Sequence, residues 1–254
     1  MIEKLSKIKS KLISSLSLKK YRNENKLFVA EGIKILQEAV KTDCKIKFVV
    51  YNQDKELPID SEHYEVFTTD DIGMKRISNL KSAPGVLTIM EIPDYKLDIE
   101  DLKSKLTMAV DDIQDPGNLG TMLRICDWFG IENLICSKNS ADVYNPKVIQ
   151  ASMGAFLRVK IHYVDLPEFI ENYKLTTAQK TYGTFLEGES IYKTKLSKDA
   201  LFIMGNEGSG ISDEITKFLD EKIFIPPYHT TEQHAESLNI SVAAAIISSE
   251  FRRG

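Results

Sequence analysis

The chain has 254 residues, of which 43% are hydrophobic and 28% charged, and its formal net charge is −4. This composition is typical of a folded globular protein and excludes a disordered or collagen-like chain. The small negative net charge excludes a protein coated in positive charge, so any affinity for nucleic acid must come from a local basic cluster.

Such a cluster occurs in residues 1–27, which carry eight basic side chains and two acidic ones. Apolar residues recur at helical spacing beside the lysines, as they do in a solvated amphipathic helix. These residues are Leu5, Ile8, Leu12 and Leu16. The same segment could follow a phosphate backbone, since each neutralised phosphate adds affinity. The two interpretations are compatible.

The rest of the N-terminal part predicts a small α/β domain. A helix is expected over residues 33–40, strands over 45–51, 66–68 and 86–90, and a turn at 82–85. Residues 93–105 mix charge with little apolar content, which is typical of a linker and places a domain boundary near residues 95–105.

Beyond residue 105, short apolar strands alternate with helices. Strands are expected over 107–111, 133–136, 158–163, 181–185, 201–204 and 222–225, and helices over 118–129, 146–153 and 235–251. Such alternation predicts an α/β fold with a mostly parallel sheet covered by helices on both faces.

The sequence shows no pattern typical of a signal peptide, a membrane helix or a disulfide framework. The charges within residues 1–11 differ from a signal peptide, and no apolar run approaches the roughly 20 residues of a membrane helix, so we expect a cytoplasmic protein without membrane contact. The three cysteines are odd in number and lie among apolar residues, which favours buried reduced thiols over disulfides or a metal site.

The first segment with candidate chemistry is a strand followed by a Pro-Gly turn and a helix. Asn118 is placed to cap this helix. Arg124 lies about 140° around the helix from Leu119, which begins the apolar stripe, so Arg124 should face a cleft or solvent. An arginine there could grip a phosphate bidentately, although an ordinary surface arginine would show the same pattern.

The second segment is the glycine-rich turn of residues 205–212, whose missing side chains would let a ligand approach the backbone. Its G-x-x-G-x-G spacing matches neither the dinucleotide-binding fingerprint nor a P-loop, and a plain strand-to-helix turn is the alternative.

The third segment covers residues 225–246. Ser237 and Asn239 precede its helix, where polar side chains can cap the helix or face a ligand. His229 and His234 lie in the preceding loop, and without a cysteine or third ligand nearby they favour a surface loop over a metal site. No metal is expected.

Together the three segments resemble, in this order, the motifs of the SpoU/TrmH family of knotted RNA methyltransferases. They are Asn118-x-Gly120-x-x-x-Arg124, Gly205-Asn206-Glu207-Gly208-Ser209-Gly210, and Ile225-Pro226 followed by Glu-Ser-Leu-Asn-x-Ser-Val-Ala-Ala-Ala-Ile at residues 236–246. Residues 144–147 and 151–155 also resemble that family, so the resemblance covers roughly residues 105–252. Residues 19–22 and 28–32 are similar to the small RNA-binding domain that often precedes the catalytic one.

The resemblance implies a C-terminal domain with a deep trefoil knot (residues 105–254), an RNA substrate-binding domain (residues 1–95), and a homodimer with composite active sites. It implies catalytic roles for Asn118, Arg124, Glu207, Ser237 and Asn239. It implies S-adenosylmethionine binding by Met204, Gly205, Asn206, Gly208, Gly210, Ile225, Pro227, Ser237, Leu238 and Asn239, and RNA contacts by Lys19, Lys20, Arg22 and Arg124. Pro227 stands where the family usually has methionine, and the loop at residues 228–235 is longer than usual.

The expected function is S-adenosylmethionine-dependent methylation of a ribose 2′-hydroxyl in RNA, with ribosomal RNA preferred over transfer RNA. A non-catalytic RNA-binding or ribosome-assembly protein is the main alternative from another class. A nucleotide-dependent oxidoreductase is disfavoured by the glycine spacing.

Overall fold

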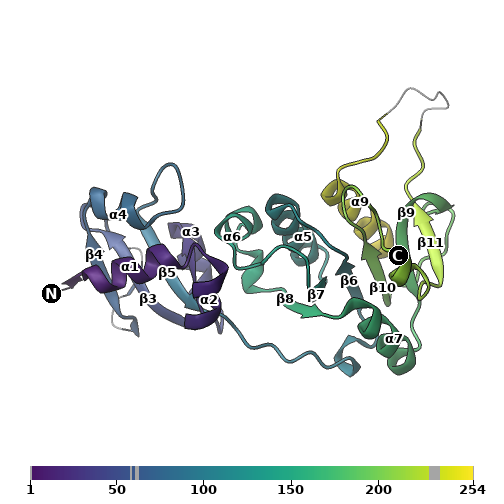
Figure 1. Ribbon diagram of the computed structural model, residues 1–254, viewed down its shortest axis with the longest axis horizontal. Helices are drawn as coiled ribbons and strands as arrows, with labels where there is room; N and C mark the ends of the chain where they lie inside the picture. Colours follow the sequence, from purple (N-terminus) through teal and green to yellow (C-terminus); the bar gives the residue numbers. More distant parts are fainter. Residues whose placement is uncertain (1, 58, 61–62, 229–234, 254) are drawn as a thin grey trace. The chain divides into compact units, whose positions relative to one another are not determined.

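The computed structural model describes residues 2–57, 59–60, 63–228 and 235–253 (Figure 1). The chain forms two compact units: unit 1 is Met1–Asp94 with Asp142–Leu157, and unit 2 is Tyr95–Ala141 with Arg158–Gly254. The chain therefore passes between the units three times. The sequence analysis predicted a single domain boundary near residues 95–105. It did not predict that residues 142–157 belong to unit 1.

Unit 1 contains a five-stranded sheet in the order β1-β4-β3-β5-β2. Strand β5 is antiparallel to β2 and β3, and the other pairs are parallel. The strands are β1 (Glu3–Lys4), β2 (Leu27–Glu31), β3 (Ile46–Asn52), β4 (Val66–Thr69) and β5 (Val86–Glu91). The helices are α1 (Lys7–Ser15), α2 (Lys19–Asn25), α3 (Ile33–Ala39), α4 (Asp71–Ile77) and α6 (Pro146–Ser152), with the short 3-10 helix η3 (Ala155–Leu157).

Both faces of this sheet are covered, because successive side chains of a strand point to opposite faces. Val29 of β2 packs in one apolar cluster with Ile13 of α1 and Ile77 of α4. On the other face, the Phe28 ring lies 4.8 Å from the Tyr144 ring and 5.7 Å from the Phe156 ring, measured between centroids. These aromatic contacts explain why the segment around α6 belongs to unit 1.

Unit 2 contains a six-stranded sheet in the order β11-β9-β10-β6-β7-β8, with every pair parallel. The strands are β6 (Leu106–Val110), β7 (Asn133–Ser137), β8 (Lys160–Val164), β9 (Thr181–Ser190), β10 (Ala200–Met204) and β11 (Glu221–Phe224). The helices are η2 (Glu100–Leu102), α5 (Pro116–Trp128), α7 (Leu166–Thr177), α8 (Asp213–Thr216) and α9 (Ile240–Arg252). The order of the strands reverses between β6 and β10, and in open parallel sheets ligands bind outside the strand ends at such a point.

Helices cover both faces of this sheet, which confirms the predicted architecture. Tyr173 of α7 packs in one cluster with Ile135 of β7 and Ile203 of β10. On the opposite face, the Phe251 ring of α9 stacks at 5.2 Å on the Phe202 ring of β10. Helix α5 packs beside α9. The fully buried strands β6 and β10 account for the unbroken apolar runs in the sequence.

Several element boundaries differ from the predictions. Residues 3–25 form a short strand and two helices rather than one amphipathic helix, and Ile8 is 82% exposed whereas Ile13 is buried. The last helix begins at Ile240, five residues later than expected, because Asn239 caps it. His229 and His234 lie outside the described residues.

The cysteines are free thiols, and Cys126 and Cys136 are buried as predicted, whereas Cys44 is only partly buried. Burial raises the pKa of Cys126 and of Cys136, so neither is a thiolate at neutral pH. Among the described residues, no group of histidine, cysteine and acidic side chains is arranged to hold a metal ion. Within the same residues, no helix has the length and apolar character to cross a membrane.

Candidate active site

The N-terminus of α5 positions the first candidate residue. The side chain of Asp115 accepts the backbone N–H of Asn118 at 2.8 Å and caps the helix, so the predicted capping role of Asn118 is wrong. Pro116 at the first helical position suits this start, because its missing N–H has no partner there in any helix. The carboxamide of Asn118 is therefore free for other contacts.

Asn118 joins the three motifs through its side chain. Its Nδ2 donates to Oε1 of Glu207 at 2.9 Å, and its Oδ1 accepts from Nδ2 of Asn239 at 3.1 Å. The hydroxyl of Ser241 lies 3.2 Å from the same Oδ1 and 3.3 Å from the backbone oxygen of Asn118. Chain segments about 90 and 120 residues apart thus meet at one carboxamide.

The glycine-rich loop after β10 is held by Asn206. Its Oδ1 accepts the N–H groups of Gly208 and Ser209 at 2.8 and 3.1 Å, and its Nδ2 donates to the backbone oxygen of Asp112 at 2.7 Å. Gly205 must be glycine, because a Cβ there would lie 2.3 Å from the carbonyl carbon of Gly210. The side chain of Asn206 therefore shapes the loop.

A hydrogen bond to Asp111, which follows β6, also holds this loop. Asp111 is 8% exposed, and its Oδ2 accepts the N–H of Ser212 at 3.0 Å. Its own N–H donates to the oxygen of Met204 at 2.9 Å, which continues the pairing of β6 with β10. The ends of the two central strands are thus fastened to each other beside the glycine-rich loop.

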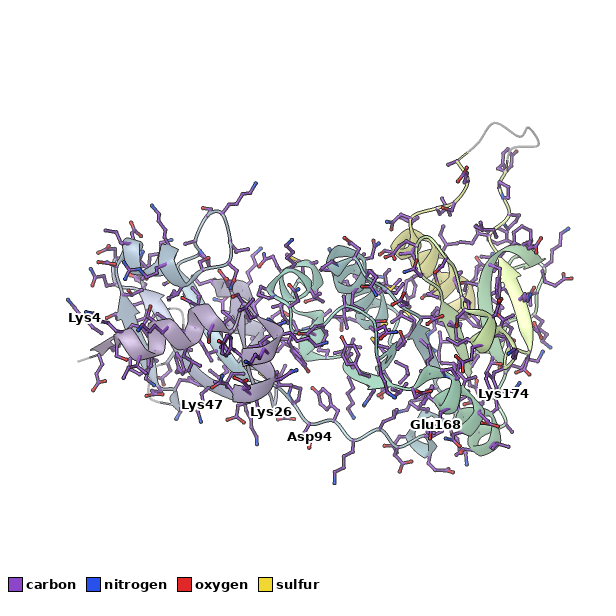
Figure 2. The ribbon with its side chains drawn as sticks, in the orientation of Figure 1. Lys4, Lys26, Lys47, Asp94, Glu168 and Lys174 are labelled. Atoms are coloured by element: carbon purple, nitrogen blue, oxygen red, sulfur yellow. The ribbon has the colours of Figure 1, made fainter. Side chains whose placement is uncertain are left out.

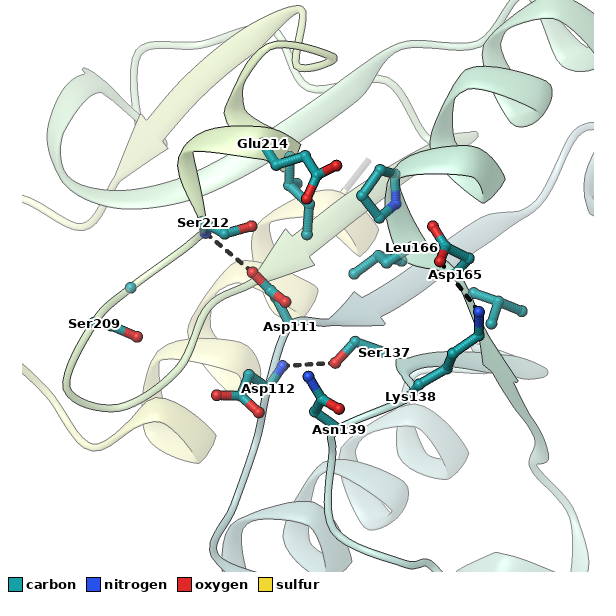
Figure 3. A pocket seen from close by; sticks show the side chains of 14 residues that line it. Asp111, Asp112, Ser137, Lys138, Asn139, Asp165, Leu166, Ser209, Ser212 and Glu214 are labelled. Carbon is teal, nitrogen blue, oxygen red and sulfur yellow. Dashed lines mark hydrogen bonds and ion pairs between the residues drawn. The ribbon is translucent and has the colours of Figure 1, made fainter.

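A pocket of about 390 Å³ opens at the strand ends next to Asp111 (Figure 3). Its charged lining has four carboxylates and one cation, Lys138, which forms an ion pair with Asp165 at 3.1 Å. The carboxylates are Asp111, Asp112, Asp165 and Glu214. Of the predicted cofactor residues, only Gly210 lines this pocket. Its negative charge disfavours the binding of an anionic group such as phosphate.

Two predicted site residues, Ser237 and Asn239, lie just before α9. Oδ1 of Asn239 accepts the N–H groups of Ser241 and Val242 at 2.9 and 3.4 Å, so Asn239 caps the helix and also contacts Asn118. Ser237 is exposed and makes no hydrogen bond with another described residue.

Apolar and glycine surfaces nearby suit an adenosyl group. Leu238 is 49% exposed, and Ile225 is partly exposed after β11. At Gly208, a Cβ would meet only Oδ1 of Asn206, at 3.6 Å, so the backbone there is open to a ligand. Exposed aliphatic side chains and open glycine backbone fit the apolar faces and polar edges of an adenine ring. Pro227 is exposed, and the loop that follows it lies mostly outside the described residues.

Arg124 does not join the Asn118 cluster within one chain. It is exposed on α5, and among the described residues it has no hydrogen bond or ion pair. It lies six residues beyond Asn118, which is about 9 Å along the helix and about 120° around it. Trp128, one turn further on, is 84% exposed.

The predicted RNA contacts of unit 1 divide into exposed and buried residues. Lys19 and Lys20 are exposed, and Figure 2 shows Lys4 and Lys26 also on the outside of this unit. Arg22 is 2% exposed, and its guanidinium donates to Asp142 and to the backbone oxygens of Leu16 and Ser17. The prediction that Arg22 contacts RNA is therefore wrong, because its donors are used inside the unit.

Ser241 and Asp111 are the residues that the sequence analysis missed. Ser241 lies two positions after Asn239 inside the third motif, so its place in that motif could have identified it as a candidate site residue. Asp111 ends the strand before the first motif, and its carboxylate is recognisable as structural only from its contact with Ser212.

Comparison with known proteins places the chain among RNA methyltransferases. Residues 105–249 match the SpoU rRNA methylase family, and residues 6–88 match the MRM3-like substrate binding domain. The Bacillus subtilis 23S rRNA (guanosine(2553)-2'-O)-methyltransferase RlmP is 27% identical over 99% of this chain and 98% of its own length.

Solved structures agree with these matches. A putative RNA methyltransferase of the TrmH family from Porphyromonas gingivalis has a TM-score of 0.87 and 32% identity, covering 98% of both chains. An AdoMet-bound rRNA methyltransferase from Sinorhizobium meliloti has a TM-score of 0.84 and 25% identity, covering 99% of this chain and 97% of the other. The first family match alone spans more than half of the sequence. The chain belongs to the SpoU rRNA methylase family.

Proposed function

We propose that this protein methylates a ribose 2′-hydroxyl of ribosomal RNA with S-adenosylmethionine as the donor. The observation that carries the proposal is the meeting of Asn118, Glu207 and Asn239, one from each motif, in a single hydrogen-bonded cluster. The names of the relatives support the reaction and favour ribosomal RNA over transfer RNA.

The cofactor would be held by the glycine-rich loop together with residues between β11 and α9. The loop residues are Met204, Gly205, Asn206, Gly208 and Gly210, and the flanking residues are Ile225, Pro227, Ser237, Leu238 and Asn239. When bound, S-adenosylmethionine supplies an electrophilic methyl group. The backbone of the loop and the exposed aliphatic side chains would orient it, and Asn206 keeps the loop in shape for that role.

The acceptor needs orientation more than activation by a strong base. A ribose hydroxyl is a weak nucleophile, so transfer depends on placing its oxygen in line at near-attack distance, roughly 3 to 3.5 Å. Arg124 cannot be an ordinary base, because its pKa lies above about 12. We assign it to the neighbouring phosphate and to the developing alkoxide charge, which a guanidinium stabilises.

A second copy of the chain would supply Arg124 to the site. Within one chain, Arg124 lies about 120° around α5 from Asn118, and the hydrogen-bonded cluster of Asn118, Glu207, Asn239 and Ser241 contains no cationic side chain of its own. Trp128 lies on the same face of α5, and Val242 of the adjacent helix α9 is 48% exposed. Burying these apolar side chains in a homodimer would remove water from them and bring a partner's arginine to the site.

The remaining assignments follow the two family matches along the sequence. Residues 1–95 would form the RNA substrate-binding domain, with Lys19 and Lys20 contacting phosphates, and residues 105–254 the methyltransferase domain. The trefoil knot implied by the family resemblance remains a prediction. We infer a cytoplasmic location, because the relative that matches over nearly its whole length is a bacterial rRNA methyltransferase.

The direct test is a map of 2′-O-methyl sites in RNA from cells with and without the gene, joined to methyl transfer by the purified protein. A ribosomal RNA position that loses its methyl group in the deletion, and regains it in vitro, supports the proposal. A transfer RNA position instead would redirect the substrate assignment. If calorimetry detects no binding of S-adenosylmethionine and the deletion loses no RNA modification, the protein is a non-catalytic RNA-binding protein instead.

A further inference from the structure

We infer that Ser241 is a positioning residue, whose hydroxyl locks the carboxamide of Asn118 in the orientation that offers its N–H to Glu207. The inference rests on the proposed function, since it gives a role in turnover to a residue outside the predicted site. It is carried by a chain of hydrogen bonds whose direction can be determined from its backbone end.

The direction is set at the first turn of α9. Backbone N–H groups can only donate, and those of Ser241 and Val242 both point at one atom of the Asn239 carboxamide, which must therefore be its oxygen. Nδ2 of Asn239 is then the atom that faces Asn118. Because Nδ2 is a donor, the atom of Asn118 that it meets must be Oδ1.

Ser241 adds a second donor at that same oxygen. Its hydroxyl lies within 3.3 Å of two acceptors, Oδ1 and the backbone oxygen of Asn118, so its proton is directed at Asn118. Ser241 is 5% exposed, which leaves little access for a replacing water molecule. A flipped Asn118 would turn its NH₂ group toward Nδ2 of Asn239, which can only donate, and would lose the hydrogen bond from the Ser241 hydroxyl to Oδ1. The observed orientation is therefore the stable one.

The consequence appears at Glu207. The locked carboxamide presents Nδ2 to Oε1 of Glu207 and holds an otherwise exposed carboxylate in one place. Oε2 has no hydrogen-bond partner among the described residues and is left for the substrate. Asn118 therefore acts through Glu207, and Ser241 acts through Asn118.

The test compares Ser241→Ala with the matched control Ser248→Ala. Ser248 lies two turns later on the same helix, is fully buried, and its hydroxyl has no hydrogen-bond partner among the described residues. We expect Ser241→Ala to lower kcat on the RNA substrate about tenfold, because the carboxamide of Asn118 would no longer hold Glu207 in one place. The KM for S-adenosylmethionine and the melting temperature should stay near those of Ser248→Ala, and Ser241→Thr should regain most of kcat.

A double-mutant cycle separates positioning from general destabilisation. In an Asn118→Ala background, single-turnover rates should show no further loss from Ser241→Ala, because the residue through which it acts is gone. An equal fold-loss in both backgrounds, or wild-type kcat in Ser241→Ala, would overturn the inference. A wild-type protein that methylates no RNA would instead refute the proposed function, so the two failures are distinguishable.

Discussion

At the scale of single residues, Asn118 is sensitive to polarity rather than to shape. Asn118→Asp keeps the size of the side chain but places a carboxylate against Oε1 of Glu207, where the wild type has an N–H donor. Two close carboxylates cannot both ionise easily, so one must bind a proton. We expect kcat near neutral pH to fall by at least about tenfold and to recover in part as the pH is lowered, because the shared proton restores a donor.

The measurement is the pH profile of methyl transfer, with Asn139→Asp as the control. That change adds the same charge at an exposed position of the same unit. A profile of Asn118→Asp that parallels the wild type at every pH would contradict the polarity argument.

Arg22 gives a second prediction at this scale. Arg22→Ala would leave Asp142 without its partner in a site where the side chain of Asp142 is 14% exposed. Removing one member of a buried ion pair costs about 3–5 kcal/mol. Lys20→Ala removes an exposed pair with Glu24 and a contact of the ammonium group with the Tyr21 ring, and it should change stability by less than about 1 kcal/mol. Urea denaturation measures both.

The same two variants separate stability from RNA binding. Lys20→Ala should weaken RNA affinity and reduce its salt dependence, because an exposed lysine can neutralise a phosphate. If Arg22→Ala unfolds at the wild-type urea concentration, the buried pair does not have the structural role described above.

At the scale of elements, the glycine-rich loop depends on close backbone contact. Gly205→Ala would force a Cβ to within 2.4 Å of the backbone nitrogen of Ile211, so the loop must move. We expect a loss of about 1–3 kcal/mol in the free energy of unfolding, as for other overpacked sites. Gly208→Ala is the control, since its Cβ would make only an ordinary contact at 3.6 Å. Equal unfolding free energies for the two variants would show that the loop adapts freely.

Helices and strands were predicted correctly where the burial of their side chains alone determines them. The central strands β6 and β10 of unit 2 are buried along their whole length, and their apolar runs indicate a sheet covered on both faces. Helix starts were less accurate, because Asp115 and Asn118 are equally good capping residues and only the backbone geometry decides between them. The burial of Arg22 was not predictable, because its partner Asp142 lies 120 residues further along the chain.

At the scale of the whole molecule, the three passages between the units matter for stability. A fragment of residues 105–254 would keep residues 142–157 without the strands of unit 1 against which Phe156 and Tyr144 pack. We expect this fragment to unfold at a lower temperature than the full chain and to bind a hydrophobic dye, because apolar side chains lose their cover. Calorimetry checks this. A fragment as heat-stable as the full chain, without dye binding, would show that residues 142–157 need no contact with unit 1.

The central claim is that an active site combines the Asn118, Glu207 and Asn239 cluster of one chain with Arg124 of another. Arg124→Ala alone should abolish methylation and leave S-adenosylmethionine affinity nearly unchanged. The most direct measurement mixes the inactive variants Arg124→Ala and Glu207→Gln after dissociation and reassociation. A heterodimer then has one site with both defects and one with neither, so activity should return to about a quarter of the wild-type value. A mixture that stays inactive although heterodimers form would contradict the claim.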